Sequence, residues 1–271
     1  MNRMKPAMPL AALACLNPTA LSRRRFLGVA MLVAGITAWP AAGRVAHAAD
    51  AATATAATSA ASSRPKIGII GSGRIGSTLG TAWLRSGHEV MFSSLDLEQD
   101  KALAAKLGKG AHAGTPREAA AFGEVLLVSV PYSALPQLGK DLAGEIRGKV
   151  IIDTSNPIPG RDGEVATQAL ARGAGLASAD MFPGARIVRA FNAIGFGRLQ
   201  AITQGQSSTV GMPIAGDDAH AIAVASALVR EARLEPVLVG PLTMGRHLRP
   251  GTPLAGELTP DQIRKLIPTL N

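Results

Sequence analysis

Short apolar runs alternate with amphipathic stretches along the chain from Lys66 onward. Apolar runs predict strands that are covered on both faces, and apolar residues repeated every three or four positions predict helices. The predicted strands are 66–70, 88–93, 124–130, 149–153, 186–190, 209–215 and 234–239. The predicted helices are 75–86, 97–107, 217–230 and a short one at 259–266. This alternation predicts an α/β fold with a doubly wound, mostly parallel sheet.

The beginning of the chain has a different pattern. The run Arg23-Arg24-Arg25-Phe26-Leu27 is followed by an apolar stretch, 28–39, and then by Ala46-His47-Ala48. A charged start, a short apolar stretch and a small-x-small site are the parts of a secretory signal, and the paired arginines resemble the twin-arginine export motif. The apolar stretch is shorter than the roughly 20 residues that span a bilayer as a helix.

We therefore expect residues 1–48 to be a twin-arginine-type signal peptide that is removed, so that the mature protein lies in the periplasm without a membrane span. An uncleaved leader that anchors the chain in the membrane is the alternative. Residues 49–64, rich in Ala, Thr and Ser, predict a flexible linker. Residues 65–240 are then a single domain, and residues 241–271, where Gly and Pro are frequent, predict a short C-terminal flap.

Composition excludes several functional classes. Six of the 28 basic residues but none of the 19 acidic ones lie in residues 1–48, so the net charge of +9 is mostly a property of the leader. With few aromatic residues and no basic run after residue 65, we expect no nucleic-acid partner. Cys15, the only cysteine, lies in the leader, and no two histidines have metal-ligand spacing. We therefore expect no disulfide, no cysteine nucleophile and no metal site.

A glycine-rich loop lies directly between the first predicted strand and the first predicted helix. Its sequence is Gly71-Ser72-Gly73-Arg74-Ile75-Gly76, with glycines in the pattern G-x-G-x-x-G. The first glycine makes the tight turn, the second lets the backbone approach a diphosphate at the helix start, and the third lets helix and strand pack closely. Because strand, loop, helix and second strand are in register, this pattern predicts a dinucleotide-binding Rossmann domain whose loop residues all bind the cofactor.

The end of the second predicted strand indicates which dinucleotide binds. An NAD site places Asp or Glu there, about 20 residues beyond the loop, to bind the ribose hydroxyls. This chain has Ser93-Ser94-Leu95, and Asp96 follows one or two positions too late. Two serine hydroxyls can hydrogen-bond a 2′-phosphate, and Arg74 in the loop can supply positive charge. We therefore expect NADP(H) as the cofactor.

Several longer motifs give a more specific resemblance. They are Gly87-His88-Glu89-Val90, Ser129-Val130-Pro131-Tyr132, Asp153-Thr154-Ser155-Asn156-Pro157, Arg189-Ala190-Phe191-Asn192, Ala215-Gly216-Asp217-Asp218 and Val239-Gly240-Pro241-Leu242. Together with the glycine loop they resemble the deazaflavin-dependent NADP oxidoreductases and their dinucleotide-binding relatives, which include the reductase domains of membrane ferric reductases. The resemblance covers nearly all of residues 66–256 and implies that NADP(H) exchanges hydride with a second redox carrier.

The resemblance also implies roles for individual residues. Ser94 would contact the 2′-phosphate, and Val130-Pro131-Tyr132 would lie beside the nicotinamide ring. Asn156 and Asn192 would close around the nicotinamide and its partner. One position departs from the family, whose members usually have Arg where this chain has Leu95. This departure removes a charge-assisted phosphate contact.

The expected function is an NADP(H)-dependent oxidoreductase that passes hydride to or from a small flavin-like or deazaflavin-like carrier, and a homodimer is compatible with it. Hydride transfer between stacked rings needs little from side chains, because the cofactors supply the reactivity. One alternative is a dinucleotide-binding sensor or partner subunit without turnover. Another is an NADPH-dependent reductase of a small carbonyl or imine, which requires a proton donor; His247 is the candidate.

Overall fold

A computed structural model describes residues 64–270 of the chain. The predicted signal peptide, 1–48, and nearly all of the predicted linker, 49–64, lie outside the described residues. No helix in the described part is long and apolar enough to cross a membrane.

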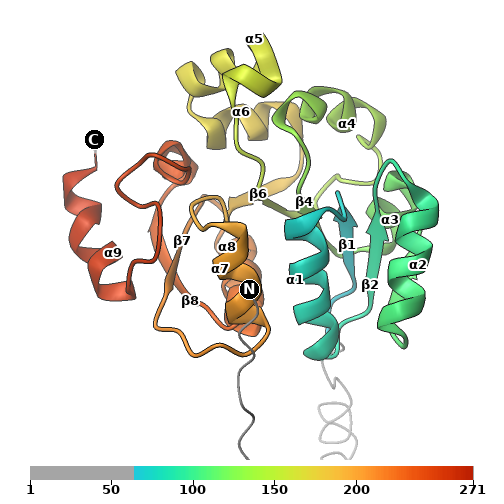
Figure 1. The fold of residues 1–271 in the computed structure, drawn as a ribbon. Coiled ribbons are helices and arrows are strands. Elements are labelled where there is room, and N and C mark those ends of the chain that lie inside the picture. The colour runs from blue at the N-terminus through green and yellow to red at the C-terminus, as the bar shows by residue number, and fades with distance from the viewer. Residues whose placement is uncertain (1–63, 271) are drawn as a thin grey trace, which may run out of the picture. The chain divides into compact units, whose positions relative to one another are not determined.

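The domain is built on one sheet with the strand order β3-β2-β1-β4-β5-β6-β7-β8 (Figure 1). The strands are β1 (Ile67–Ile70), β2 (Val90–Ser93), β3 (Ala111–Ala113), β4 (Val125–Val128), β5 (Val150–Asp153), β6 (Arg186–Arg189), β7 (Gly211–Gly216) and β8 (Glu235–Gly240). Neighbouring strands are parallel except β6 and β7, which are antiparallel. The order reverses between β1 and β4, so the predicted doubly wound, mostly parallel sheet is confirmed.

Helices connect the strands on both faces of the sheet. They are α1 (Arg74–Arg85), α2 (Leu97–Leu107), α3 (Pro116–Phe122), α4 (Leu135–Asp141), α5 (Pro159–Arg172), α6 (Ala174–Met181), α7 (Phe196–Thr203), α8 (Ala219–Glu231) and α9 (Pro260–Leu266), with 3-10 turns η1 (Tyr132–Ala134), η2 (Leu242–His247) and η3 (Ile267–Thr269). The apolar pattern did not predict β3 or α3 to α7. β3, α3, α4, α6 and α7 are at most eight residues long, and α5, with 14 residues, has few large apolar residues and is interrupted at Gly163.

Alternate residues of the central strands enter different cores. Val125 and Leu127 of β4 face a core formed with α1, α7 and α8, whereas Leu126 and Val128 face a core formed with α4, α5 and α6. Such double burial explains why the sequence of β4 is apolar without interruption. Because β1 to β6 are all parallel, their carboxyl ends lie at one edge of the sheet, where the loops of the candidate site begin.

The C-terminal segment packs against the two reversed strands. Ala215 of β7 and Val237 of β8 are buried in one cluster with three residues of this segment, Leu248, Leu254 and Ile263. Ile263 belongs to α9. A capping box at the start of α9, in which Thr259 and Gln262 exchange side-chain hydrogen bonds with backbone amides, fixes where this helix begins. The segment predicted as a flap therefore covers β7 and β8 with apolar side chains, and its helix α9 lies beside these two strands (Figure 1).

Candidate functional site

Each glycine of the loop between β1 and α1 has a distinct reason to lack a side chain. Gly71 has φ of +101°, and a Cβ there would lie 2.2 Å from the carbonyl oxygen of Ser129. A Cβ on Gly76 would lie 2.0 Å from the carbonyl oxygen of Gly71, so this glycine lets α1 approach the loop. Gly73 is different, since a Cβ there would have no atom within 4 Å. Its missing side chain leaves open space at the helix start, as the predicted diphosphate requires.

The first turn of α1 presents free amide groups to that space. The residue before the helix is Gly73, which offers no side-chain cap, and no acidic residue lies in the first turn. The amide of Ser77 donates to the carbonyl oxygen of Gly73 at 2.9 Å. Helix geometry therefore leaves the amides of Arg74, Ile75 and Gly76 without an intrahelical partner. Free amides and the positive end of the helix dipole together fit a diphosphate.

The structure corrects one expectation at the end of β2, where the sequence indicated no carboxylate. Asp100, in α2, is fully buried and accepts hydrogen bonds from the hydroxyls of Ser72 and Ser94, the latter at 2.8 Å. Ser93 turns inward and donates to the carbonyl oxygen of Ile69 at 2.7 Å. The sequence did not reveal Asp100 because one turn of helix, rather than strand register, brings it to this position.

The positive charges at this end differ from the predicted arrangement. Arg74 has its guanidinium 5.6 Å from the centre of the Phe196 ring, at the start of α7. None of the hydrogen bonds found among residues 64–270 joins Arg74 to Ser94. Leu95, at the position where the resemblance leads us to expect Arg, is fully exposed. The charged group beside Ser94 is therefore the buried carboxylate of Asp100 and not the guanidinium of Arg74.

On the other side of the loop, the predicted nicotinamide residues differ in exposure. Pro131 is exposed and Val130 is half-buried, whereas Tyr132 is fully buried. The Tyr132 hydroxyl lies 3.0 Å from the carbonyl oxygen of Ala174 and 3.1 Å from the Ser178 hydroxyl. Burial raises the pKa of Tyr132 to about 12. Tyr132 thus stays protonated and joins η1 to α6, while Pro131 faces the open side.

A buried ion pair joins the carboxyl ends of β5 and β6. Arg189 Nη1 lies 2.6 Å from Asp153 Oδ2, and both side chains are fully buried. The amide of Ser155 and the hydroxyl of Ser178 also donate to Asp153, at 2.8 Å and 2.7 Å. Arg189 Nη2 donates to the carbonyl oxygen of Ser155 at 3.0 Å and to the side chain of Asn156 at 3.3 Å. The pair therefore holds the loop that carries Asn156.

Asn156 and Asn192, which the resemblance places around the nicotinamide, lie together at this edge. Asn156 Nδ2 donates to the carbonyl oxygen of Asn192 at 2.8 Å. Asn192 Oδ1 and Ser155 Oγ are buried and have no hydrogen-bond partner among residues 64–270. Phe191, immediately before Asn192, is a non-glycine residue with φ of +63°. Unsatisfied buried polar atoms and a strained backbone beside them are features of a ligand site.

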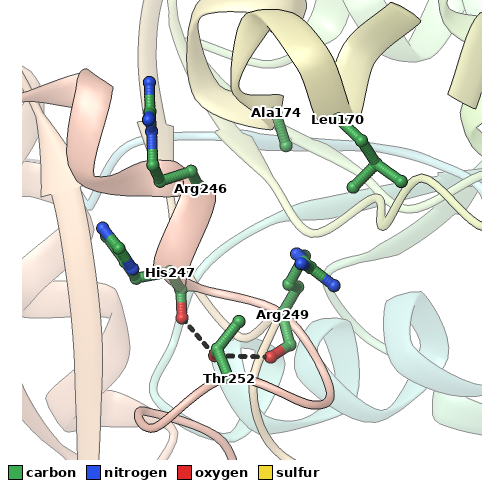
Figure 2. Close-up of a pocket in the computed structure, with 6 residues that line it drawn as sticks. All are labelled: Leu170, Ala174, Arg246, His247, Arg249 and Thr252. Carbon is green, nitrogen blue, oxygen red and sulfur yellow. Dashed lines mark hydrogen bonds between the residues drawn. The ribbon is translucent and has the colours of Figure 1, made fainter. Parts of the chain in front are cut away.

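His247 lies outside this cluster, in a cavity of about 190 Å³. The cavity is lined by residues of α5, α6, η2 and the following loop, namely Leu170, Ala174, Arg246, His247, Arg249 and Thr252 (Figure 2). Arg189 Nη2 lies 3.5 Å from the carbonyl oxygen of Leu248, which connects this segment to the ion pair described above. No group of side chains within the described residues could hold a metal ion.

Comparison with known proteins confirms the predicted resemblance. Residues 66–157 match the family described as NADP oxidoreductase coenzyme F420-dependent. The chain is also 32% identical over 187 residues to Metalloreductase STEAP3 of Rattus norvegicus; the match covers 68% of this chain and 36% of that protein. The chain thus spans little more than a third of the length of this relative.

Solved structures confirm the fold. A hypothetical protein from Sinorhizobium meliloti aligns with a TM-score of 0.58 and 22% identity over 72% of this chain and 94% of its own. A protein from Arthrobacter sp. FB24, assigned as an F420-dependent NADP-reductase, aligns with a TM-score of 0.55 and 20% identity over 67% of this chain and 87% of its own. These likenesses show that the domain has a Rossmann-like α/β fold, and residues 66–157, which carry the glycine loop, match the NADP oxidoreductase family model.

Proposed function

We propose, from the match of residues 66–157 to the F420-dependent NADP oxidoreductases, that this protein transfers hydride between NADP(H) and a flavin-like or deazaflavin-like carrier. The observation that supports this most strongly is the open space beside Gly73, where a Cβ would meet no atom within 4 Å, next to the uncapped start of α1. The backbone amides of the first turn of α1 would hold the diphosphate, and Ser94 would face the adenosine ribose.

The carboxyl ends of β5 and β6 would hold the other end of the dinucleotide. Asn192 Oδ1 and Ser155 Oγ have no hydrogen-bond partner in the described part of the chain, so they fit the carboxamide of a nicotinamide, which brings the donors and the acceptor that these atoms lack. The Asp153–Arg189 pair would keep both loops in place during binding. The cofactor would supply the hydride chemistry, and this chain's residues would orient it.

A ring-stacking carrier fits the side chains better than an alcohol or carbonyl substrate. Carbonyl reduction requires a proton as well as a hydride, so it needs a positioned acid. Tyr132 is buried, makes its hydrogen bonds to α6 and has a pKa raised to about 12, so it does not reach the open side. Pro131 and half-buried Val130 instead offer an apolar surface on which a ring can stack.

The test is calorimetric titration of residues 49–271 with NADPH and NADH, followed by an acceptor screen with flavin, deazaflavin and quinone. We expect NADPH to bind and a flavin or deazaflavin to oxidise it. The variant Gly73→Val should bind neither nucleotide yet unfold at the wild-type temperature, because its side chain fills the diphosphate space without a clash inside the protein. Failure of wild type to bind either nucleotide would refute the proposal.

The two alternatives predict other outcomes of the same screen. A sensor or partner subunit binds NADPH tightly but leaves it unoxidised with every acceptor. A reductase of a small carbonyl or imine oxidises NADPH only with those substrates, and His247→Gln then lowers kcat.

We further propose that the protein is exported to the periplasm by a twin-arginine-type signal, on the basis of the run Arg23-Arg24-Arg25-Phe26-Leu27. Export of the folded chain would allow a dinucleotide to be bound before translocation. Replacing Arg23 and Arg24 by Lys keeps the charge and should retain the full-length chain in the cytoplasmic fraction. Unchanged export of this variant would contradict the proposal.

A further inference from the structure

A groove follows α1 where this helix lies beside α7 (Figure 1). It consists of two hollows of about 270 Å³ and 370 Å³. The first lies between α1, α2 and α7 and is lined by Lys106 and Arg85, and the second lies where α1, α7 and α8 end and is lined by Arg85 and Arg233. Because Arg85 and the end of α7 line both hollows, the groove is continuous. Its three cations follow one another in the order Lys106, Arg85, Arg233.

The two arginines point to the same end of α7. Arg85 Nη1 donates to the carbonyl oxygen of Thr203 at 3.2 Å. A Cβ on Gly205, two residues further along the chain, would lie 3.8 Å from Arg233 Nη1. All three cations of the groove are exposed, and none of the ion pairs found among residues 64–270 includes them. The groove therefore presents positive charge that the described residues do not neutralise.

One acidic residue lines the groove, Glu231 at the end of α8. Both of its carboxylate oxygens have partners outside the row of three cations. Oε1 lies 2.6 Å from Arg64 Nη1, and Oε2 lies 2.6 Å from His88 Nε2. Glu231 is thus engaged elsewhere, and the row of cations is left to attract an anion from solution.

The backbone of Arg233 gives a second, independent observation. Its φ is +66°, in the left-handed region where glycine is favoured and any other residue is strained. Arg233 has no ion pair among residues 64–270 that would compensate for this strain. Strained positions of this kind gather at sites that hold a ligand. A charged side chain here is explained if it contacts something outside the domain.

The lining fits a peptide better than a nucleic acid or a single phosphate. None of the described residues that line the groove is aromatic, so it lacks the stacking surface that single-stranded nucleic acids use. Gln200 and Gln204 bring side-chain amides, which can both donate to and accept from peptide groups. Leu103 and Leu107 of α2 add an apolar border. Three cations in a row match acidic side chains along an extended chain, whereas a compact phosphate would reach only part of the row.

We propose that this groove binds an extended acidic segment of a partner protein through Lys106, Arg85 and Arg233. Acidic side chains of the segment would pair with the three cations, and its backbone would hydrogen-bond to Gln200 and Gln204. Attraction of this kind selects a partner by its charge and weakens as salt is added. The inference is independent of the proposed redox function, because none of these residues belongs to the glycine loop or to the strand ends.

A fluorescently labelled oligoglutamate peptide is the probe, and fluorescence anisotropy measures its Kd with residues 49–271, the chain expected after removal of the leader. We expect salt-dependent binding. Arg85→Gln, Lys106→Gln and Arg233→Gln should each raise Kd about two- to fivefold, and the triple variant about tenfold to a hundredfold. Arg85→Lys keeps the charge and should retain most of the affinity. Arg147→Gln, which removes an exposed charge that does not line the groove, serves as the control and should leave Kd unchanged.

Four results would overturn the inference. The first is no binding of oligoglutamate by the wild type, and the second is an equal loss in Arg147→Gln and in the groove variants. The third is tighter binding of pyrophosphate, or of an oligodeoxynucleotide of equal charge, since either would assign the groove to another class of ligand. The fourth follows from the position of Arg85 and Lys106 in the last turns of their helices, where cations also stabilise a helix. If thermal melting followed by circular dichroism shows that only unfolded variants lose the peptide, the cations are structural.

Discussion

Replacing Asp100 by Asn should strengthen the binding of NADPH relative to NADH. Ser94 is the residue that the resemblance assigns to the 2′-phosphate, but its hydroxyl donates to Asp100 at 2.8 Å. Ser72 in the glycine loop donates to the same carboxylate. A 2′-phosphate at Ser94 would therefore meet a like charge and a hydroxyl whose proton is already used. The Asn side chain has the same shape and no charge.

The geometry gives the size of the effect. Ser94 Oγ lies 2.8 Å from the Asp100 carboxylate, so a phosphate oxygen in contact with the same hydroxyl would lie about 5 Å from that carboxylate. Two unit charges at about 5 Å repel by about 3 kcal/mol at an effective dielectric constant of about 20. Solvent and salt at the exposed phosphate reduce this to about 1.4–2.8 kcal/mol, which is about 10- to 100-fold in Kd.

The assay is calorimetric titration of wild type and Asp100→Asn with both nucleotides at two salt concentrations. The ratio of Kd for NADH to Kd for NADPH should rise about 10- to 100-fold in the variant, mostly through NADPH. Glu98→Gln is the matched control, because it removes a charge from the same helix at an exposed side chain that pairs with Lys101. An unchanged ratio in Asp100→Asn, or the same change in Glu98→Gln, would refute the reasoning.

Three further predictions concern the buried groups around the site. Arg189→Met leaves Asp153 buried without its cation, so urea denaturation should show a loss of about 3–5 kcal/mol, part of which Asp153→Asn in the same chain restores; an unaffected midpoint would contradict this. Tyr132→Phe should lower stability by about 1 kcal/mol and leave kcat unchanged, whereas a large fall in kcat would reveal an acid role. Burial alone would raise the pKa of Asp162, but hydrogen bonds from Arg161 and the backbone lower it to about 2. Because the pKa of Asp162 is lower in the folded than in the unfolded state, its carboxylate should stabilise the folded protein fully above about pH 4 and no longer do so towards about pH 2. In Asp162→Asn, the free energy of unfolding measured by acid denaturation should therefore fall less over this range.

Strong local signals made most of the architecture predictable. Fully apolar strands such as β4 and the glycine loop before α1 are read directly from the sequence, because burial on both faces and a tight turn each demand particular residues. The short elements were missed for the opposite reason. β3 is three half-buried residues, and α3, which follows a capping box at Thr115, has three alanines among its seven residues and one large apolar residue, Phe122, so neither has a periodic apolar face.

The site was predictable where strand ends determine it and unpredictable where helices complete it. Asn156 and Asn192 lie together because β5 and β6 are neighbours, which the order of elements implies. Asp153 and Arg189 are likewise register partners at the ends of β5 and β6. Asp100 reaches Ser94 only through the geometry of α2. That contact depends on tertiary packing, and a single sequence holds no local sign of it.

The junction of β6 and β7 has a mechanical consequence. Parallel strands β4 and β5 are joined by four residue pairs, whereas β6 and β7 share two, Val188 with Gly216 and Arg189 with Ala215. Two residue pairs are the fewest between any neighbouring strands of this sheet. Local opening begins where the fewest contacts stabilise the structure. Bending of the sheet should therefore concentrate between β6 and β7. Hydrogen exchange should be faster at Arg189 and Ala215, which pair across this junction, than at the equally buried amides of β4.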